Sequence, residues 1–372
     1  VPNLDDTALY GNRELSALDF HQRVLDQAWD RSHPLLERVR FLAIVGSNLD
    51  EFCMVRLASL RRWQRAGQEH AGPDGLTVGQ QLSAVRRRLS VLLKNQATCW
   101  NEELRPALAK VGVEFVEPDD YDEAARTYLS SYFAADVYPL LTPLAIDPGH
   151  PFPQISNRST NIAVLVRHNR RLRVARLKIP ALLPRFVPLP GRAGQAPHRF
   201  AFLEDIVRTH LGDLFPGVEV VSAHLFRVVR DSDIDVRNAG EDLMEEVHRS
   251  LRELRDGPPS LLHVEDTMPR RLLELLVENL DVDDDVVMRT RERLAFCDWA
   301  ALYKLPLAGL KYPPLVPHTT WPTEGRGSVV FDDIRTEDIL VHHPFDSFGA
   351  VESFVRDAAT DPHVLAIKMT LY

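Results

Sequence analysis

The sequence has 372 residues, of which 45% are hydrophobic and 26% are charged, the composition of a soluble globular protein with room for two or three domains. No run of about 18 apolar residues occurs, so no membrane-spanning helix is expected. The formal net charge of −9 argues against a general nucleic-acid-binding surface, although a local basic groove remains compatible with it.

Residues 1–110 show the 3.6-residue hydrophobic period of helices. Helices are expected at 16–30, from 34 to about 60, and from 77 to about 108. Glycine and proline at 67–75 indicate a loop between the second and third helices. We therefore expect a helical N-terminal domain.

Between residues 111 and 321 short strands alternate with helices, which is typical of an α+β domain with a mostly antiparallel sheet. The expected strands are 113–116, 161–167, 172–179, 199–202, 218–229 and 261–264. The expected helices are 122–133, 203–214, 241–255 and 270–280. Residues 139–153 are rich in proline and follow no period, so an irregular connection is expected there.

The last residues follow a proline-rich crossing at 311–327. They predict a strand at 338–342, a helix at 346–359 and a strand at 364–371. Such a unit is normally a right-handed crossover between parallel strands. One unit cannot bury both faces of its sheet, so we expect residues 322–372 to be the start of a third, α/β domain, truncated at Tyr372.

A run of polar residues, Ser47-Asn48 and Asp50-Glu51, interrupts the apolar pattern of the second helix. Asn48 followed three residues later by Glu51 is a variant capping box, which predicts that a helix begins at Asn48. A helix N-terminus also offers open main-chain N–H groups to an anion. The spacing is compatible with either a cap or a contact to a ligand.

Three further groups of side chains have an ordinary structural interpretation beside a functional one. The basic run Arg167–Arg173 is either a polyanion site or a solvated hairpin turn, and the turn is favoured. His342 and His343 end a predicted strand, but adjacent strand residues point to opposite faces, which favours a structural or solvent role. Cys53, Cys99 and Cys297 match no metal spacing, so buried, reduced thiols in a cytoplasmic protein are expected; association with a membrane surface stays open.

Several blocks, spread in order over the whole chain, resemble bacterial polyphosphate kinases. They are NRELS at 12–16, PLLER at 34–38, SNLDEF at 47–52, LTPLAIDPGHPF at 141–152, PRFV at 184–187, RDSD at 230–233, DILVHHPF at 338–345, and VLAIK with TLY at 364–372. No GxxxxGK[ST], GxGxxG, GxSxG or HExxH motif is present, so the usual phosphate-binding loops and hydrolase signatures do not compete with this resemblance.

The resemblance implies reversible transfer of the ATP γ-phosphoryl group to the end of inorganic polyphosphate, through a phosphohistidine and with Mg²⁺. It implies a multidomain α+β protein: a helical N-terminal domain (1–110), an α+β head domain that mediates homodimerisation (111–321), and the beginning of a phospholipase D-like α/β domain (322–372). The partners implied are ATP, ADP and polyphosphate, with no nucleic acid. In the family the Asn of this block contacts ATP, which implies that Asn48 binds ATP here.

Some residues of the family lie beyond the matched blocks. Its magnesium-associated Arg directly follows the segment matched by Leu371-Tyr372, and its phosphorylated His lies further on. The resemblance therefore implies no catalytic and no metal-binding residue within this chain, and an inactive piece if the polypeptide ends there. Two alternatives stay open: a non-catalytic dimerising fragment, or another phosphotransferase of the phospholipase D type. The second leaves the Asn48 block unexplained.

Overall fold

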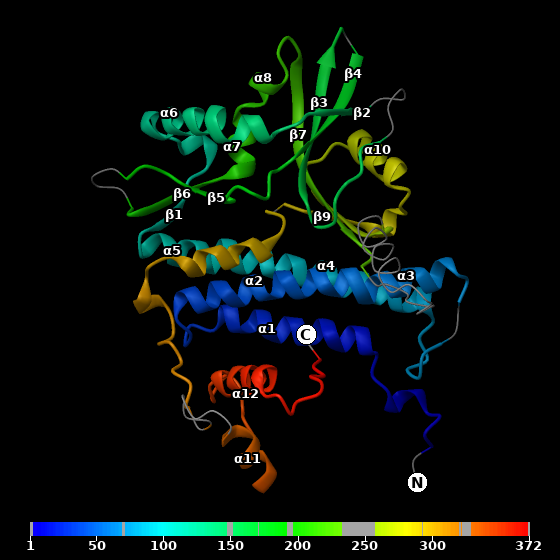
Figure 1. Ribbon diagram of the computed structural model, residues 1–372. Helices are drawn as coiled ribbons and strands as arrows, with labels where there is room; N and C mark the ends of the chain where they lie inside the picture. Colours follow the sequence, from blue (N-terminus) through cyan, green and yellow to red (C-terminus); the bar gives the residue numbers. More distant parts are fainter. Residues whose placement is uncertain are drawn as a thin grey trace. The chain divides into compact units, whose positions relative to one another are not determined.

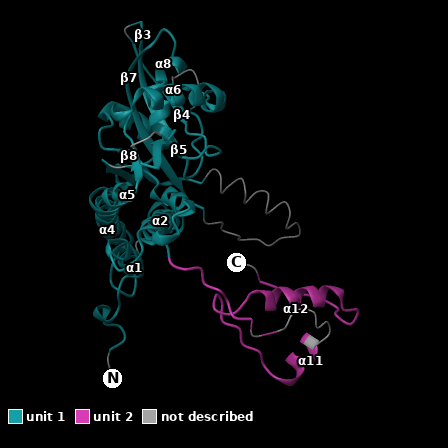
Figure 2. Cartoon of the chain, turned by 90° about the vertical axis from the view of Figure 1, so that its left-hand side faces the viewer, with its two compact units in different colours: residues 1–311 teal, residues 312–372 magenta. Residues whose placement is uncertain are grey.

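The computed structural model describes residues 3–68, 71–146, 152–169, 171–191, 196–232, 257–291, 293–319, 321 and 329–370. Contacts divide the chain into two compact units, residues 1–311 and residues 312–372 (Figure 2). The helix expected at 241–255 lies outside the described residues.

The N-terminal region is helical, as its hydrophobic period predicts. Its helices are α1 (Arg13–Trp29), α2 (Leu35–Phe52), α3 (Ala58–Arg65), α4 (Val78–Thr98) and α5 (Arg105–Lys110). A π-helical turn at Cys53–Leu57 joins α2 to α3 without a break, and a second one at Cys99–Leu104 joins α4 to α5. Asn12 caps α1 and Thr77 begins α4 with a capping box, so two of the helix starts have ordinary chemical causes.

Two sheets follow the helices (Figure 1). The smaller has the order β1-β6-β5 and the larger the order β2-β4-β3-β7-β8-β9. All pairings are antiparallel except β1 with β6 and β8 with β9. The strands are β1 (Val113–Phe115), β2 (Leu144–Ile146), β3 (Thr160–His168), β4 (Arg171–Lys178), β5 (Phe186–Pro188), β6 (His198–Phe202), β7 (Glu219–Arg230), β8 (Pro259–Glu265) and β9 (Val287–Thr290). The prediction missed β2, β5 and β9, because three or four residues are too few to show a period of two.

Helices and short helical turns complete the first unit. The helices are α6 (Glu123–Tyr132), α7 (Leu203–Thr209), α8 (Leu211–Leu214) and α10 (Arg270–Leu280). The turns are Thr7–Leu9, Pro118–Asp120, Phe133–Val137, Tyr138–Leu140, Asp284–Val286, Phe296–Lys304 and Ala308–Leu310. The single helix expected at 203–214 is interrupted at His210, whose main chain leaves helical geometry with φ −112° and ψ 18°.

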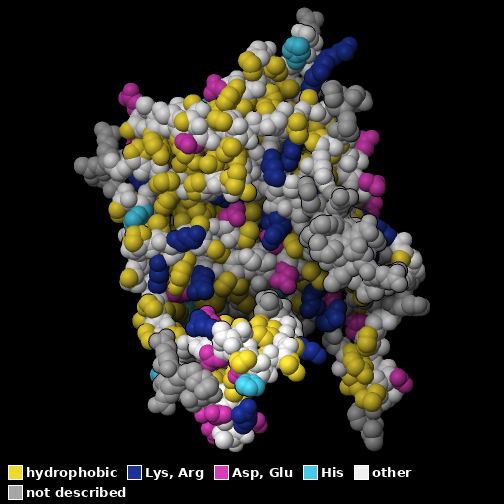
Figure 3. All heavy atoms as spheres, viewed as in Figure 1, with side chains coloured by type: hydrophobic (Ala, Val, Ile, Leu, Met, Phe, Trp, Pro, Cys, Tyr) yellow, Lys and Arg dark blue, Asp and Glu magenta, His cyan; other side chains and the backbone are white. Residues whose placement is uncertain are grey.

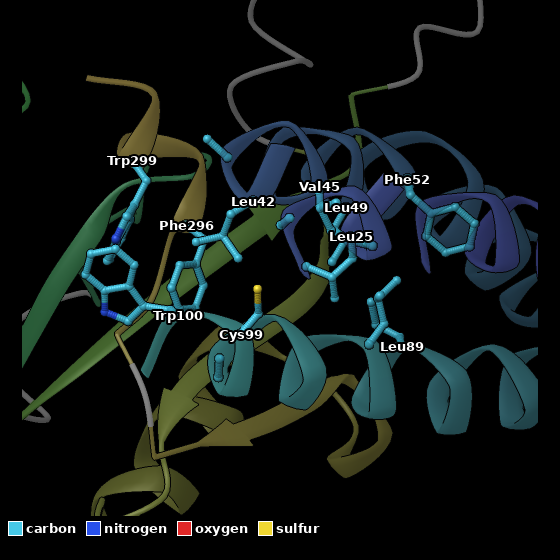
Figure 4. Close-up of a cluster of buried hydrophobic side chains, with 14 of the residues drawn as sticks. Leu25, Leu42, Val45, Leu49, Phe52, Leu89, Cys99, Trp100, Phe296 and Trp299 are labelled. Atoms are coloured by element: carbon cyan, nitrogen blue, oxygen red, sulfur yellow. The ribbon is translucent and has the colours of Figure 1, made fainter. Parts of the chain in front are cut away.

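The buried hydrophobic residues of the first unit form three clusters, and one of them joins the N-terminal helices to both sheets (Figure 4). Trp100 after α4 and Trp299 of the segment Phe296–Lys304 meet edge to face with ring centroids 5.3 Å apart. The same segment lies against α2 so closely that a Cβ added to Gly46 would come within 2.5 Å of the Cys297 main-chain nitrogen. Gly46 is therefore required by packing, although glycine is a poor residue inside a helix.

The second unit contains α11 (Val329–Thr336) and α12 (Gly349–Thr360), whose Phe331 and Phe354 rings lie 5.8 Å apart. Helix α12 confirms the helix expected at 346–359. The prediction of strands at 338–342 and 364–371 is wrong, because the described residues of these two segments belong to no β-sheet. Leu340 and Leu365 are 93% and 98% exposed. A strand needs a neighbour for its N–H and C=O groups, and none of the described residues supplies one.

The three cysteines form no disulfide; Cys53 and Cys99 are buried and Cys297 is partly exposed. Burial raises the pKa of each thiol to about 12, so all three are protonated near neutral pH. In the part of the chain that the structure describes, no helix combines the length and apolar character needed to cross a bilayer.

Candidate functional site

Asn48 lies inside α2, four residues before its end, and not at a helix N-terminus. The capping box and the anion site at an open helix end are therefore both wrong for this position. Leu42, Val45 and Leu49 continue the buried stripe of α2 through the polar run, so packing carries the helix past the residues that resemble a start signal. Asn48 is half-buried. Because it caps no helix, its side-chain amide can interact with a neighbouring helix or a ligand.

Asp50, two residues on, points to the opposite side of the helix. Its carboxylate accepts two hydrogen bonds from the Arg227 guanidinium on β7, at 2.5 and 2.6 Å. The two side chains are only 9% and 4% exposed. Two residues along an α-helix correspond to about 200° of rotation. Within the polar run, Asp50 therefore contacts the sheet, whereas Asn48 and Glu51 lie on the face of the helix that is turned away from the sheet.

That outward face lines a cavity of about 940 Å³ between α1 and the continuous rod of α2, the π-helical turn and α3. Its wall from α1 includes Phe20, His21 and Arg23. The wall from the rod includes Asn48, Glu51, Arg56 and Trp63, with Arg13 and Glu14 at the start of α1 completing the lining. π-helical turns inside α-helices are frequent at functional sites, and here the turn supplies Val55 and Arg56 to the cavity.

Asn48 and His21 meet across this cavity wall, with Asn48 Nδ2 3.5 Å from His21 Nδ1. The imidazole contacts Phe20 and Phe52 edge to face, with ring centroids 5.8 and 6.3 Å apart. Burial lowers the pKa of His21 and the positive charge of Arg56 lowers it further, while Glu51 opposes both. The ring is therefore neutral near pH 7 and has one nitrogen that accepts a hydrogen bond.

The cavity carries more positive than available negative charge. Glu14 is buried and is already engaged: it accepts from Arg13 Nε at 3.0 Å and from Arg56 Nη1 at 3.2 Å. Arg23 lies over the Phe20 ring, 5.6 Å from its centroid. Phe20 and Trp63 are half-exposed aromatic side chains. Arginines beside exposed aromatic rings suit a ligand that combines an anionic group with a flat ring.

The other residues singled out from the sequence do not join this site. In the second unit His343 Nδ1 lies 3.0 Å from the main-chain oxygen of Asp346, and the His342 main-chain N–H donates to the Asp346 carboxylate at 2.7 Å. These contacts hold a local turn and agree with a structural role. Arg167 pairs with Glu219 on the neighbouring strand, as expected of an exposed hairpin.

His21, Phe20, Arg56 and Trp63 were not predicted from the sequence as residues of a site. The signal was a set of residues at helical spacing outside the apolar stripe: positions 13, 16 and 20 on α1 and 48, 51, 55 and 59 on the rod. This pattern indicates a site only when it is known that these faces of α1 and of the rod lie against each other. Among the described residues no group of three or more His, Cys, Asp or Glu is placed to hold a metal ion, so those residues do not by themselves form a magnesium site.

Comparison with known proteins gives three family matches that follow one another along the chain. Residues 10–116 match the polyphosphate kinase N-terminal domain, residues 124–302 the polyphosphate kinase middle domain, and residues 329–372 the polyphosphate kinase C-terminal domain 1. The helical region, the mixed sheets and the last unit therefore correspond to three successive domains of one family.

Individual proteins give the same result. The polyphosphate kinases of Mycolicibacterium gilvum and Mycobacterium avium are each 43% identical to this chain over 98% of its length and 51% of theirs. The crystal structure of polyphosphate kinase from Porphyromonas gingivalis superposes with a TM-score of 0.76 at 27% identity, covering 95% of this chain and 50% of that one. The chain belongs to the polyphosphate kinase family, and it spans about half the length of the curated relatives it matches.

Proposed function

We propose that this chain is the part of a polyphosphate kinase that supplies one wall of the ATP site, and that Asn48 contacts the nucleotide. The observation that carries the proposal is the cavity between α1 and the α2–α3 rod, where Asn48 lies among half-exposed aromatic rings and arginines. A nucleotide offers both a flat base and anionic phosphates, which are the two chemistries that these side chains bind.

The reaction proposed for the whole enzyme is reversible transfer of the ATP γ-phosphoryl group to the end of polyphosphate through a phosphohistidine. In phosphoryl transfer the protein mainly positions the substrate and neutralises charge. Asn48 would orient the nucleotide, and Arg56, only partly neutralised by Glu14, would stabilise its phosphates. ATP would arrive as its magnesium complex, because the residues that the structure describes form no site for the ion alone.

Nucleotide binding by the 372-residue chain tests this proposal. We expect Mg·ATP to bind weakly, since only one wall is present, and Asn48→Ala to weaken it about 2- to 10-fold, the effect of one hydrogen bond. Asn95→Ala is a matched control, because its amide donates to Gln22 Oε1 at 3.0 Å and lies outside the cavity. Isothermal titration calorimetry gives both dissociation constants. Equal losses in the two variants would reject a nucleotide contact by Asn48.

The nucleophile is proposed to lie outside these residues, since neither His342 nor His343 corresponds to it in the resemblance. The 372-residue polypeptide, incubated with γ-labelled ATP and Mg²⁺, should then gain no acid-labile, base-stable phosphate. Label at such a bond would place the phosphohistidine within the chain, and His342→Gln and His343→Gln would show which ring carries it.

We also propose that the chain forms a homodimer through residues 111–321. Support comes from exposed apolar side chains on α6, just after it, and on β2, the edge strand of the larger sheet: Tyr128, Tyr138, Leu140 and Leu144. Figure 3 shows hydrophobic side chains concentrated over the α6 region. Such surfaces often mark interfaces between protein chains. Sedimentation equilibrium should give twice the monomer mass at micromolar concentration; Tyr138→Glu with Leu140→Glu should give the monomer, and a monomeric parent chain would refute the proposal.

A further inference from the structure

The amide of Asn48 has two possible orientations in the cavity, and its neighbour His21 distinguishes them. Asn48 Nδ2 lies 3.5 Å from His21 Nδ1. The two residues come from different helices, α2 and α1. The imidazole is held from two sides by the rings of Phe20 and Phe52, at interplanar angles of 64° and 83°. The position of Nδ1 relative to the amide is therefore set by packing and not by the ligand.

The charge and the tautomer of the imidazole decide which end of the amide faces it. The amide nitrogen lies next to Nδ1 and can only donate, which fits a neutral ring with its proton on Nε2. Burial and the charge of Arg56 favour the neutral ring, and Glu51 favours the charged one. The other charged side chains around the cavity are Arg13, Arg23 and Glu14, the last of which is engaged by Arg13 and Arg56. With Nδ1 as acceptor, the amide donates one N–H to His21. Its carbonyl oxygen and its second N–H, the one on the same side as the oxygen, remain for a ligand.

We propose that His21 fixes the amide of Asn48 in this orientation and so makes the cavity select adenine over guanine nucleotides. The inference rests on the proposed function. Adenine presents an amino donor next to the N1 acceptor, which matches the carbonyl oxygen and the free N–H of the amide. Guanine presents the O6 acceptor next to the N1–H donor, which is the reverse pattern. With the base in the same position, Asn48 could pair with guanine only after its amide turned by 180°, and its oxygen would then face the lone pair of His21 Nδ1. His21 is in this sense a positioning residue, because it acts on the base through Asn48.

The ratio of the GTP to the ATP dissociation constant, measured on the 372-residue chain, tests the inference. Three variants are compared with the parent chain. His21→Phe keeps a ring of similar size but has no acceptor, and it should reduce the ratio about 2- to 10-fold, the effect of one hydrogen bond. His21→Asn restores a carbonyl acceptor near the position of Nδ1 and should restore the ratio. His33→Phe is the control, because the His33 ring contacts Gln27 and Phe41 and lies outside the cavity.

A change of pH provides a second, independent measurement. Protonation converts Nδ1 into a donor, which favours the turned amide and therefore guanine. Since the pKa of His21 lies below its usual value of 6.5, the ratio in the parent chain should stay constant from pH 8 to about 6.5 and fall below that. In His21→Phe it should not depend on pH. A melting temperature by circular dichroism establishes that each variant is folded.

The two proposals fail differently. If ATP does not bind, or if Asn48→Ala has no effect on it, the nucleotide site itself is wrong. If ATP binding depends on Asn48 but the ratio is the same in His21→Phe as in the parent chain, the site stands and the role of His21 is overturned. A ratio that still falls at low pH in His21→Phe would also overturn it, because a group other than His21 would then be responsible.

Discussion

Asp50 of α2 and Arg227 of β7 form a buried, doubly hydrogen-bonded pair that joins the helical region to the larger sheet. Burial alone would lower the pKa of Arg227, but the hydrogen bonds and charge of Asp50 more than offset it and raise that pKa. The arginine therefore stays charged. The pair fixes the rotation of α2 on the sheet, and this rotation directs Asn48, about 200° away around the helix, toward the cavity.

Asp50→Asn should destabilise the fold by about 3–5 kcal/mol, because Arg227 would remain buried without a counter-charge. Urea unfolding followed by circular dichroism measures the effect. Glu51→Gln changes the neighbouring, exposed carboxylate in the same way and should stay within about 0.5 kcal/mol of the parent chain. Similar losses for the two substitutions would contradict a special role for the buried pair.

Asn48→Ala should leave the melting temperature unchanged or slightly raised. Asn48 is inside α2 and caps no helix, and alanine is the better helix former by about half a kcal/mol. Loss of an N-cap would instead cost about 0.5–2 kcal/mol. A clear fall in melting temperature would therefore favour the structural interpretation of Asn48 over the binding one. Asn12→Ala, which removes a true cap from α1, shows the size of a capping loss in the same protein.

Stability should fall on mild acidification because of His263 on β8. Burial lowers the pKa of this ring to about 4; the charge of Arg227 also lowers it, and Asp50 opposes. The unfolded chain takes up the proton first, so stability is lost as the pH falls from about 6.5 toward 4, by on the order of 3 kcal/mol. Urea midpoints at pH 7, 5.5 and 4.5 measure the slope. It should be smaller in His263→Gln and unchanged in His363→Gln, whose ring is exposed; equal slopes in both variants would exclude His263 as the cause.

Gly46→Ala should destabilise the first unit by about 1–3 kcal/mol, although alanine favours a helix. The added methyl would lie 2.5 Å from the Cys297 nitrogen and 2.9 Å from the Phe296 carbonyl carbon, both main-chain atoms that cannot turn aside. Gly79→Ala on α4 meets nothing within 4 Å and should be neutral or stabilising. Thermal unfolding of the two variants compares them, and a Gly46→Ala chain as stable as Gly79→Ala would show that the segment Phe296–Lys304 does not press on α2.

The helical region was predictable because its signals are local. The stripe of Leu18 and Leu25 on α1, and that of Leu82, Val85 and Leu89 on α4, repeats at helical spacing whatever lies beside it. The long strands β3, β4 and β7 were predictable for the same reason. The blocks of resemblance also belong to the sequence alone, and they led to the polyphosphate kinase family before any contact was known.

Tertiary structure decided the meaning of the polar run. Ser47 to Glu51 has the pattern of a helix start, while the hydrophobic period that predicts a helix from 34 to about 60 runs through it, and these two local signals disagree. Contacts to residues more than 170 positions away stabilise the continuous helix. Arg227 donates hydrogen bonds to Asp50, and the main chain at Cys297 packs against Gly46. The strands expected at 338–342 and 364–371 failed for the same physical reason. Burial and hydrogen bonding depend on which residues, distant in the sequence, lie beside a given residue in the fold. The local sequence pattern does not specify those residues.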